Sequence, residues 1–128
     1  MTRLVLLTSL VLAALQAAWP ARAEMATAFP PAAAALEPAA LQARLVGQVF
    51  RAVDAQGRDW RMEYSRLGHL FVDVGTGFKD DGPYRVEGSQ VCVTLRRSGA
   101  SCSEYRVDGD AVYLRRASNG EVLTLVRQ

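Results

Sequence analysis

Apolar and polar side chains alternate along the chain from residue 48 to its end, and turn-forming residues interrupt the alternation about every ten positions. In the stretch 59–65, Trp60, Met62 and Tyr64 share one face of a predicted strand, and mostly charged residues share the other. The pattern predicts strands at 48–54, 59–65, 69–74, 83–87, 90–95, 101–107, 111–116 and 121–127. Because the links are too short for the crossovers that parallel strands need, neighbouring strands must be antiparallel.

The expected fold is therefore all-β, a single small antiparallel meander of about eight strands that closes into a barrel or folds into a sandwich. A local echo in the sequence supports the meander. YRVEGSQVCVTLRRSG at 84–99 resembles YRVDGDAVYLRRASNG at 105–120, and each copy enters an acidic-glycine turn and ends in Leu-Arg-Arg. We interpret the two copies as successive hairpins.

The residues before the strands follow a different pattern. LEPAALQARLVG predicts one short N-terminal helix at 36–46, in which Leu41 and Leu45 lie one turn apart and Gly47 ends the helix. Residues 24–35, EMATAFPPAAAA, have no amphipathic period and are expected to form a flexible leader. The folded domain is thus expected to span 36–128.

The first residues predict a signal peptide at 1–23. Arg3 precedes an apolar run, Pro20 ends it, and the small residues Ala21 and Ala23 fit a cleavage site. An uncleaved membrane anchor is the alternative, but the run is about 15 residues where a spanning helix needs about 20. We expect a periplasmic or secreted protein with no membrane span after cleavage.

Loss of this segment changes the net charge. The full chain carries 15 basic and 13 acidic residues. Since Arg3 and Arg22 leave with the predicted signal peptide, the mature chain is expected to be neutral. Net charge therefore gives no support to a nucleic-acid partner.

Cys92 and Cys102 are the only cysteines, and an exported protein would join them in a structural disulfide. They lie on adjacent predicted strands and can face each other across the turn between them. Their spacing is not that of a Cys-x-x-Cys redox motif, and with His69 alone they make a poor metal site. Strict alternation places them outside the barrel, whereas a bulge in the turn would place them inside, and both alternatives stay open.

The stretch GTGFKDDG at 75–82 combines glycines, the single lysine and two aspartates. It lacks the Gly-Lys-Ser/Thr of a phosphate loop and the alternating acidic residues of a calcium loop, so we interpret it as a solvated loop. Phe78 in this loop either folds back over the barrel mouth or contacts a partner.

No residue pattern indicates catalysis. His69 lacks the nucleophile and orienting group that a catalytic base needs, and is read as a surface residue. Nothing in the spacing of the carboxylates selects an acid and base pair from Asp54, Asp59, Glu63 and Asp73. The Arg-Arg pairs at 96–97 and 115–116 lie at the ends of equivalent predicted strands. They are interpreted either as solvated strand ends or as a small basic patch. We predict no catalytic residue, no cofactor and no metal, hence no enzyme.

From Asp81 to Leu125 the chain resembles the back half of small periplasmic lipocalin-like proteins of alphaproteobacteria. The matching positions are Gly82-Pro83-Tyr84-Arg85-Val86, then Cys92, Cys102, Asp108-Gly109 and Gly120-Glu121-Val122-Leu123. The same order is more distantly similar to bacterial inhibitors of secreted metalloproteases, which are eight-stranded barrels with one disulfide. The resemblance implies a barrel fold and a periplasmic location, and no residue match carries the inhibitory role.

Two functions follow from these expectations. The first is an exported lipocalin-like binding or structural module of the bacterial envelope, with Trp60, Met62 and Tyr64 lining the interior around a small apolar ligand. The second is a protein-interaction module, such as a secreted-protease inhibitor, that contacts an envelope or secreted protein through the 24–35 leader or Phe78. A monomer is expected in both cases.

Overall fold

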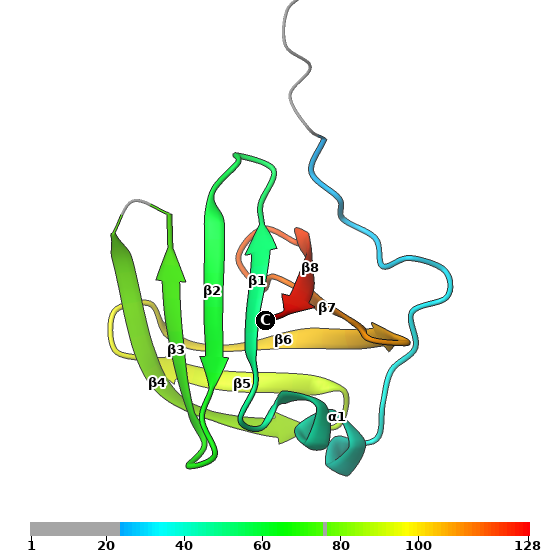
Figure 1. Cartoon of the computed structure of the whole chain (residues 1–128), viewed down its shortest axis with the longest axis horizontal. Coiled ribbons are helices and arrows are strands. Elements are labelled where there is room, and N and C mark those ends of the chain that lie inside the picture. Colours follow the sequence, from blue (N-terminus) through cyan, green and yellow to red (C-terminus); the bar gives the residue numbers. More distant parts are fainter. Residues whose placement is uncertain (1–23, 76) are drawn as a thin grey trace, which may run out of the picture.

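The structure is a computed structural model that describes residues 24–75 and 77–128, so the predicted signal peptide at 1–23 lies outside the described residues. Its eight antiparallel strands form a closed barrel in which each strand pairs with the next and β8 pairs with β1 (Figure 1). The strands are β1 (Val49–Val53), β2 (Asp59–Tyr64), β3 (His69–Val74), β4 (Phe78–Glu87), β5 (Gln90–Leu95), β6 (Gly99–Asp108), β7 (Ala111–Arg115) and β8 (Val122–Arg127). The meander prediction is confirmed, and the barrel is the form it takes.

Most strands match their predicted bounds to within one or two residues, and β4 differs by five at its start. β4 begins at Phe78, so most of the stretch predicted as a solvated loop is paired with β3, from Val74↔Phe78 to His69↔Pro83. Beyond Pro83, β4 pairs with β5 instead. At this change of partner the backbone comes so close to Thr94 that a Cβ atom on Gly82 would lie 1.9 Å from the Thr94 carbonyl oxygen. Only glycine fits there without movement of the backbone.

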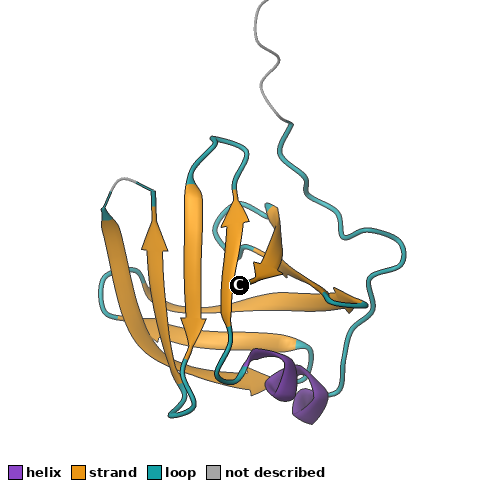
Figure 2. Cartoon of the chain, viewed as in Figure 1, coloured by secondary structure: helices purple, strands orange, loops and turns teal. Residues whose placement is uncertain are grey.

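The predicted helix is present as α1 (Pro38–Leu45) and lies at one end of the barrel (Figure 2). Pro38 occupies its first turn, where a missing N–H costs no hydrogen bond. Leu41 and Leu45 are fully buried and join the barrel core. Within the described ranges, no helix is long and apolar enough to cross a membrane.

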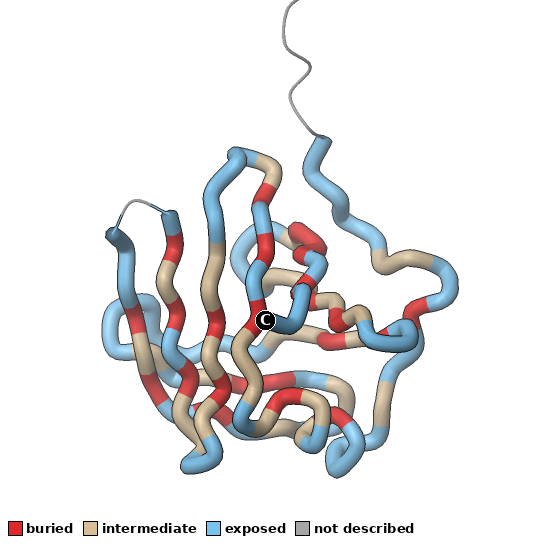
Figure 3. The backbone as a smooth tube through the Cα atoms, in the orientation of Figure 1, coloured by how far each residue is buried: buried red, intermediate tan, exposed pale blue. Residues whose placement is uncertain are grey.

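Burial alternates along the strands, as expected when one face of each strand lines the barrel (Figure 3). Near α1 the interior is filled by aromatic rings. The ring of Tyr64 packs edge-on against Phe50, Tyr84 and Tyr105 at centroid distances of 5.8, 5.3 and 6.5 Å. The Tyr64 and Tyr105 hydroxyls share a hydrogen bond, and burial raises the pKa of both phenols above the usual value of 10.0. This aromatic cluster closes the α1 end of the barrel.

The segment 24–35 differs from the expected flexible leader, because it is bound along the outside of the barrel. The Ala26 carbonyl accepts a hydrogen bond from the Val122 N–H, and Ala34 forms a β-bridge with Val107. Between these anchors the Phe29 ring lies against the guanidinium groups of Arg106 and Arg115, 4.6 and 4.9 Å from its centroid. Backbone pairing needs no amphipathic period, which is why the composition gave no sign of these contacts.

The predicted disulfide between Cys92 and Cys102 is confirmed. The two residues are direct partners across β5 and β6, with Cα atoms 4.0 Å apart. Their strand neighbours Val91 and Ser103 line the interior, so the alternation of side chains places the bridge on the outer wall. The alternative in which a bulge turns the bridge inward is thereby excluded.

Candidate functional site

The half of the barrel away from α1 is hollow. It contains a cavity of about 700 Å³ whose residues reach the connections β1–β2, β5–β6 and β7–β8, and we call this end the mouth. The interior walls are mainly apolar, formed by Trp60, Met62, Leu70, Val72, Val74, Phe78, Val91, Val93, Leu95 and Leu114. The polar lining comes from Arg58, Asp80, Ser98, Arg116 and Ser118 at the mouth and from Ser101, Ser103 and Tyr105 along β6.

Of the predicted lining residues, Trp60 and Met62 face the cavity and Tyr64 does not. Tyr64 is fully buried, and its hydroxyl is hydrogen-bonded to that of Tyr105, which does line the cavity. The physical reason is that the end of β2 that carries Tyr64 lies beside α1, where side chains fill the barrel. Tyr105 therefore lies at the boundary between the cavity and the packed aromatic rings, where it contacts Tyr64.

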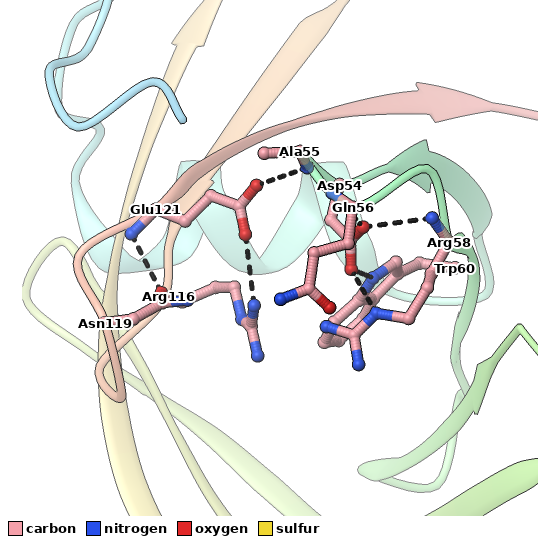
Figure 4. A network of polar contacts seen from close by, with 8 residues as sticks. All are labelled: Asp54, Ala55, Gln56, Arg58, Trp60, Arg116, Asn119 and Glu121. Carbon is pink, nitrogen blue, oxygen red and sulfur yellow. Dashed lines mark hydrogen bonds and ion pairs between the residues drawn. The ribbon is translucent and has the colours of Figure 1, made fainter. Parts of the chain in front are cut away.

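Asp54 holds the β1–β2 connection and Trp60 in place (Figure 4). Its carboxylate accepts hydrogen bonds from the Trp60 indole N–H at 2.9 Å and from Arg58 Nε at 2.7 Å. The backbone N–H groups of Gln56 and Arg58 donate to its other oxygen. Burial alone would raise the pKa of Asp54, but these hydrogen bonds outweigh burial and lower it to about 2. The carboxylate is therefore ionised at neutral pH and orients the indole in the cavity wall.

Glu121 joins the β7–β8 connection to the β1–β2 connection across the mouth. Its carboxylate is only 5 % exposed and accepts from the Ala55 N–H at 2.8 Å and from Arg116 Nη1 at 3.1 Å. The Arg116 guanidinium lies over the Trp60 ring, 4.7 Å from the centroid. Figure 4 shows Glu121 and Arg116 on one side of this network, with Asp54, Arg58 and Trp60 on the other.

Asp80 holds the β5–β6 connection in the same way. Its carboxylate accepts from the Ser98 hydroxyl and N–H at 2.7 and 2.8 Å, and from the Arg97 and Asp81 N–H groups at 2.9 Å. Burial would raise its pKa, but these hydrogen bonds outweigh burial and lower it. Phe78 folds over the mouth and lines the cavity, with the Arg97 guanidinium 4.6 Å from its ring centroid. Phe78 is also 41 % exposed, so its contact with a partner stays a prediction.

The two similar sequence segments form equivalent parts of the structure. Residues 84–99 and 105–120 form the hairpins β4–β5 and β6–β7, as predicted. Arg97 and Arg116 are the last residues of the two Leu-Arg-Arg sequences, and each guanidinium covers an aromatic ring at the mouth. Arg116 also lines the cavity. Only the second arginine of each pair is thus at the mouth, because Arg115 lies against Phe29 on the outer wall and Arg96 pairs with Asp81.

The other candidates belong to the outer surface. His69 Nε2 lies 2.7 Å from an Asp81 oxygen, and Lys79 pairs with Asp73 at 3.8 Å. Glu87 lies beside Cys92 and Cys102, but sulfur atoms joined in a disulfide are not the thiolates that bind metals.

Sequence reasoning missed the three buried carboxylates and the interior serines. Asp54 and Glu121 each lie beside a glycine turn at a strand end, which is the usual place for a carboxylate that caps a turn. Ser101 and Ser103 alternate with Cys102 and share a face with Tyr105, so the period of two could have placed them inside. Nothing local marks Asp80, because its main partner is Ser98, on a different hairpin.

Comparison of the chain with protein-family models, with curated proteins and with solved structures finds no match. The resemblance to small periplasmic lipocalin-like proteins therefore stays a prediction.

Proposed function

We propose that this protein is an exported binding module of the bacterial envelope that holds one small, mainly apolar molecule inside its barrel. The observation that carries the proposal is the cavity of about 700 Å³ between the mouth and Tyr105. Ligand sites are usually hollows of about 300–1,000 Å³ with apolar walls and a few fixed polar groups. An eight-stranded barrel has room for packed side chains or for one small ligand, and here side chains pack one half and the cavity takes up the other.

The disulfide supports the exported location. A Cys92–Cys102 bridge forms and persists in oxidising compartments such as the periplasm, and the cytosol keeps such pairs reduced. Together with the predicted signal peptide at 1–23, it supports a protein that acts in the periplasm or after secretion.

We expect no catalytic activity at the mouth. Asp54 and Asp80 each accept four hydrogen bonds from the protein's own groups, which leaves no free lone pair to act as a base. Glu121 is buried and paired with Arg116. A contact module that inserts its leader into a partner is also less favoured, since Ala26 and Ala34 are bound to the barrel wall.

Native mass spectrometry of the protein tests the proposal directly. The full chain would be expressed with residues 1–23 in a bacterial host and recovered from the envelope without reducing agent. We expect a monomer with its disulfide intact and with additional small-molecule mass. A second polypeptide in place of that mass would contradict the proposal and favour the contact module.

Two neighbouring residues give a matched pair of variants. Val93 faces the cavity, and Thr94 beside it on β5 points outward and is exposed. Val93→Phe should abolish the bound mass, and Thr94→Phe should retain it. Ser101→Leu, which fills the cavity from the opposite strand, repeats the test if Val93→Phe does not fold. Equal retention by all three variants would show that the molecule binds elsewhere.

A further inference from the structure

The mouth of the cavity carries two arginines whose hydrogen-bonding capacity is only partly used. Arg58 donates to Asp54 through Nε and its side chain is 43 % exposed. Arg116 donates to Glu121 through Nη1, is stacked on Trp60, and its side chain is 20 % exposed. Both residues line the cavity. A guanidinium has five N–H donors in a fixed plane, so each keeps donors for a further acceptor.

The carboxylates at the same end are bonded to the protein's own donors. Asp54 and Asp80 each accept four hydrogen bonds, and Glu121 accepts two. All three residues are buried, with exposed fractions of 5, 4 and 5 %. Asp54 and Glu121 are outside the cavity lining, whereas Asp80 is part of it. The four bonds to Asp80 use the lone pairs of both its oxygens, so the groups at the mouth with free hydrogen-bonding capacity are the donors of Arg58 and Arg116.

The arginines are also held in fixed positions. Asp54 and Trp60 restrain Arg58 and Arg116, so a bound acceptor does not have to order flexible side chains. Burying the body of a ligand in the apolar walls brings its head group to this end, because Tyr105 and the aromatic cluster close the other.

Building on the proposed binding function, we propose that the ligand is an anionic amphiphile, with an apolar body in the cavity and a carboxylate bound at the mouth by Arg58 and Arg116. The arginines thus select the head group, and the walls formed by Met62, Val72 and Leu114 select an apolar body. The proposal names the ligand by class, an aliphatic monocarboxylate being its simplest member.

Three probes of equal chain length separate the head group from the chain. Decanoate, decan-1-ol and decyltrimethylammonium, below their micellar concentrations, would be titrated into the full chain by isothermal calorimetry. Charge-assisted hydrogen bonds to arginine should make decanoate bind about tenfold more tightly than decanol, or better. The cationic probe should bind most weakly.

The outcomes distinguish the two proposals. Equal binding of decanoate and decanol, or tighter binding of the cation, would overturn the head-group proposal and leave the binding function standing. Absence of binding for all three chains would overturn both, because no apolar body would then enter the barrel.

Variants assign the selectivity to residues. Arg58→Gln and Arg116→Gln should each weaken decanoate binding about tenfold and leave decanol binding unchanged. Unchanged decanol binding also shows that the variant is folded. Arg116→Lys, which keeps a charge beside Glu121, serves if Arg116→Gln does not fold. Arg51→Gln, exposed on β1 and outside the cavity lining, is the matched control and should change neither affinity. Loss of decanoate binding in Arg51→Gln as well would contradict a site at the mouth.

Discussion

The Tyr64 and Tyr105 hydroxyl oxygens lie 2.5 Å apart and join β2 to β6, two strands that are not neighbours in the barrel. Both residues are buried, and each hydroxyl is the hydrogen-bond partner of the other. This contact is where the filled half of the barrel meets the hollow half.

Tyr105→Phe should therefore lower the free energy of unfolding by about 1–3 kcal/mol, because it leaves the Tyr64 hydroxyl buried without a partner. The double variant Tyr64→Phe/Tyr105→Phe should cost less than the sum of the single variants, since it removes both polar groups. Urea unfolding of all three proteins measures the coupling. Strictly additive losses would contradict the mutual dependence of the two hydroxyls.

Asp54→Asn should destabilise the fold by about 1–3 kcal/mol at neutral pH, because its amide N–H₂ would face the donors of Arg58 and Trp60. The pKa of Asp54 falls from 3.8 to about 2 on folding, so its ionised form stabilises the fold above pH 3.8. That stabilisation is lost as the pH falls toward 2. Urea unfolding at several pH values should show wild type and variant converging across this range. Asp59→Asn, exposed at the start of β2, is the control and should show no such convergence.

Replacement of both cysteines by alanine should lower the free energy of unfolding by about 2–3 kcal/mol, the amount expected for a loop of this length. Because the bridge lies on the outer wall, affinity for a cavity probe such as decanoate should stay the same in the folded variant. Unfolding and calorimetry on the same preparation measure both quantities. A change in affinity without a change in stability would contradict this prediction, because it would mean that the disulfide affects the cavity and not the stability of the fold.

Gly82→Ala should cost about 3 kcal/mol or more, because the new Cβ would lie 1.9 Å from backbone that cannot move alone. Gly57→Ala provides the comparison, since its φ of +78° is unfavourable for alanine but no atom lies within 4 Å of the new Cβ. The Gly57 variant should lose about 1–2 kcal/mol. Thermal unfolding ranks the two, and a smaller loss at Gly82 would contradict the close approach of β4 to β5.

Phe29→Ala should lower stability by about 1 kcal/mol, since it removes the ring between Arg106 and Arg115. The same change should make the 24–35 segment more sensitive to limited proteolysis. Leu67→Ala, at a residue that is 96 % exposed, is the control and should alter neither property. Unchanged proteolysis of the Phe29 variant would mean that Ala26 and Ala34 hold the segment without the ring.

The strands could be predicted from sequence because alternation and turn residues are local signals. β4 was the exception, because the charged residues Lys79, Asp80 and Asp81 are typical of a solvated loop. In the fold, Asp80 is buried and bonded to Ser98 from another hairpin, a contact that no local pattern indicates. The cysteine pairing followed from the spacing of two strands and one turn. The cavity could not be predicted in the same way. The alternation that places a residue such as Val93 inside the barrel is the same whether the interior is filled or hollow.

The division of the barrel into two halves has a consequence for how this protein can change over evolutionary time. The rings around Tyr64 are closely packed, so a substitution that changes the size of one of them would lower the stability of the fold. Sequence change at that end is therefore constrained by stability. A side chain that projects into the hollow half has open space on one side, and a change in its size costs fewer packed contacts. Substitutions in the hollow half can therefore change which ligand is bound, while the packed half continues to stabilise the fold.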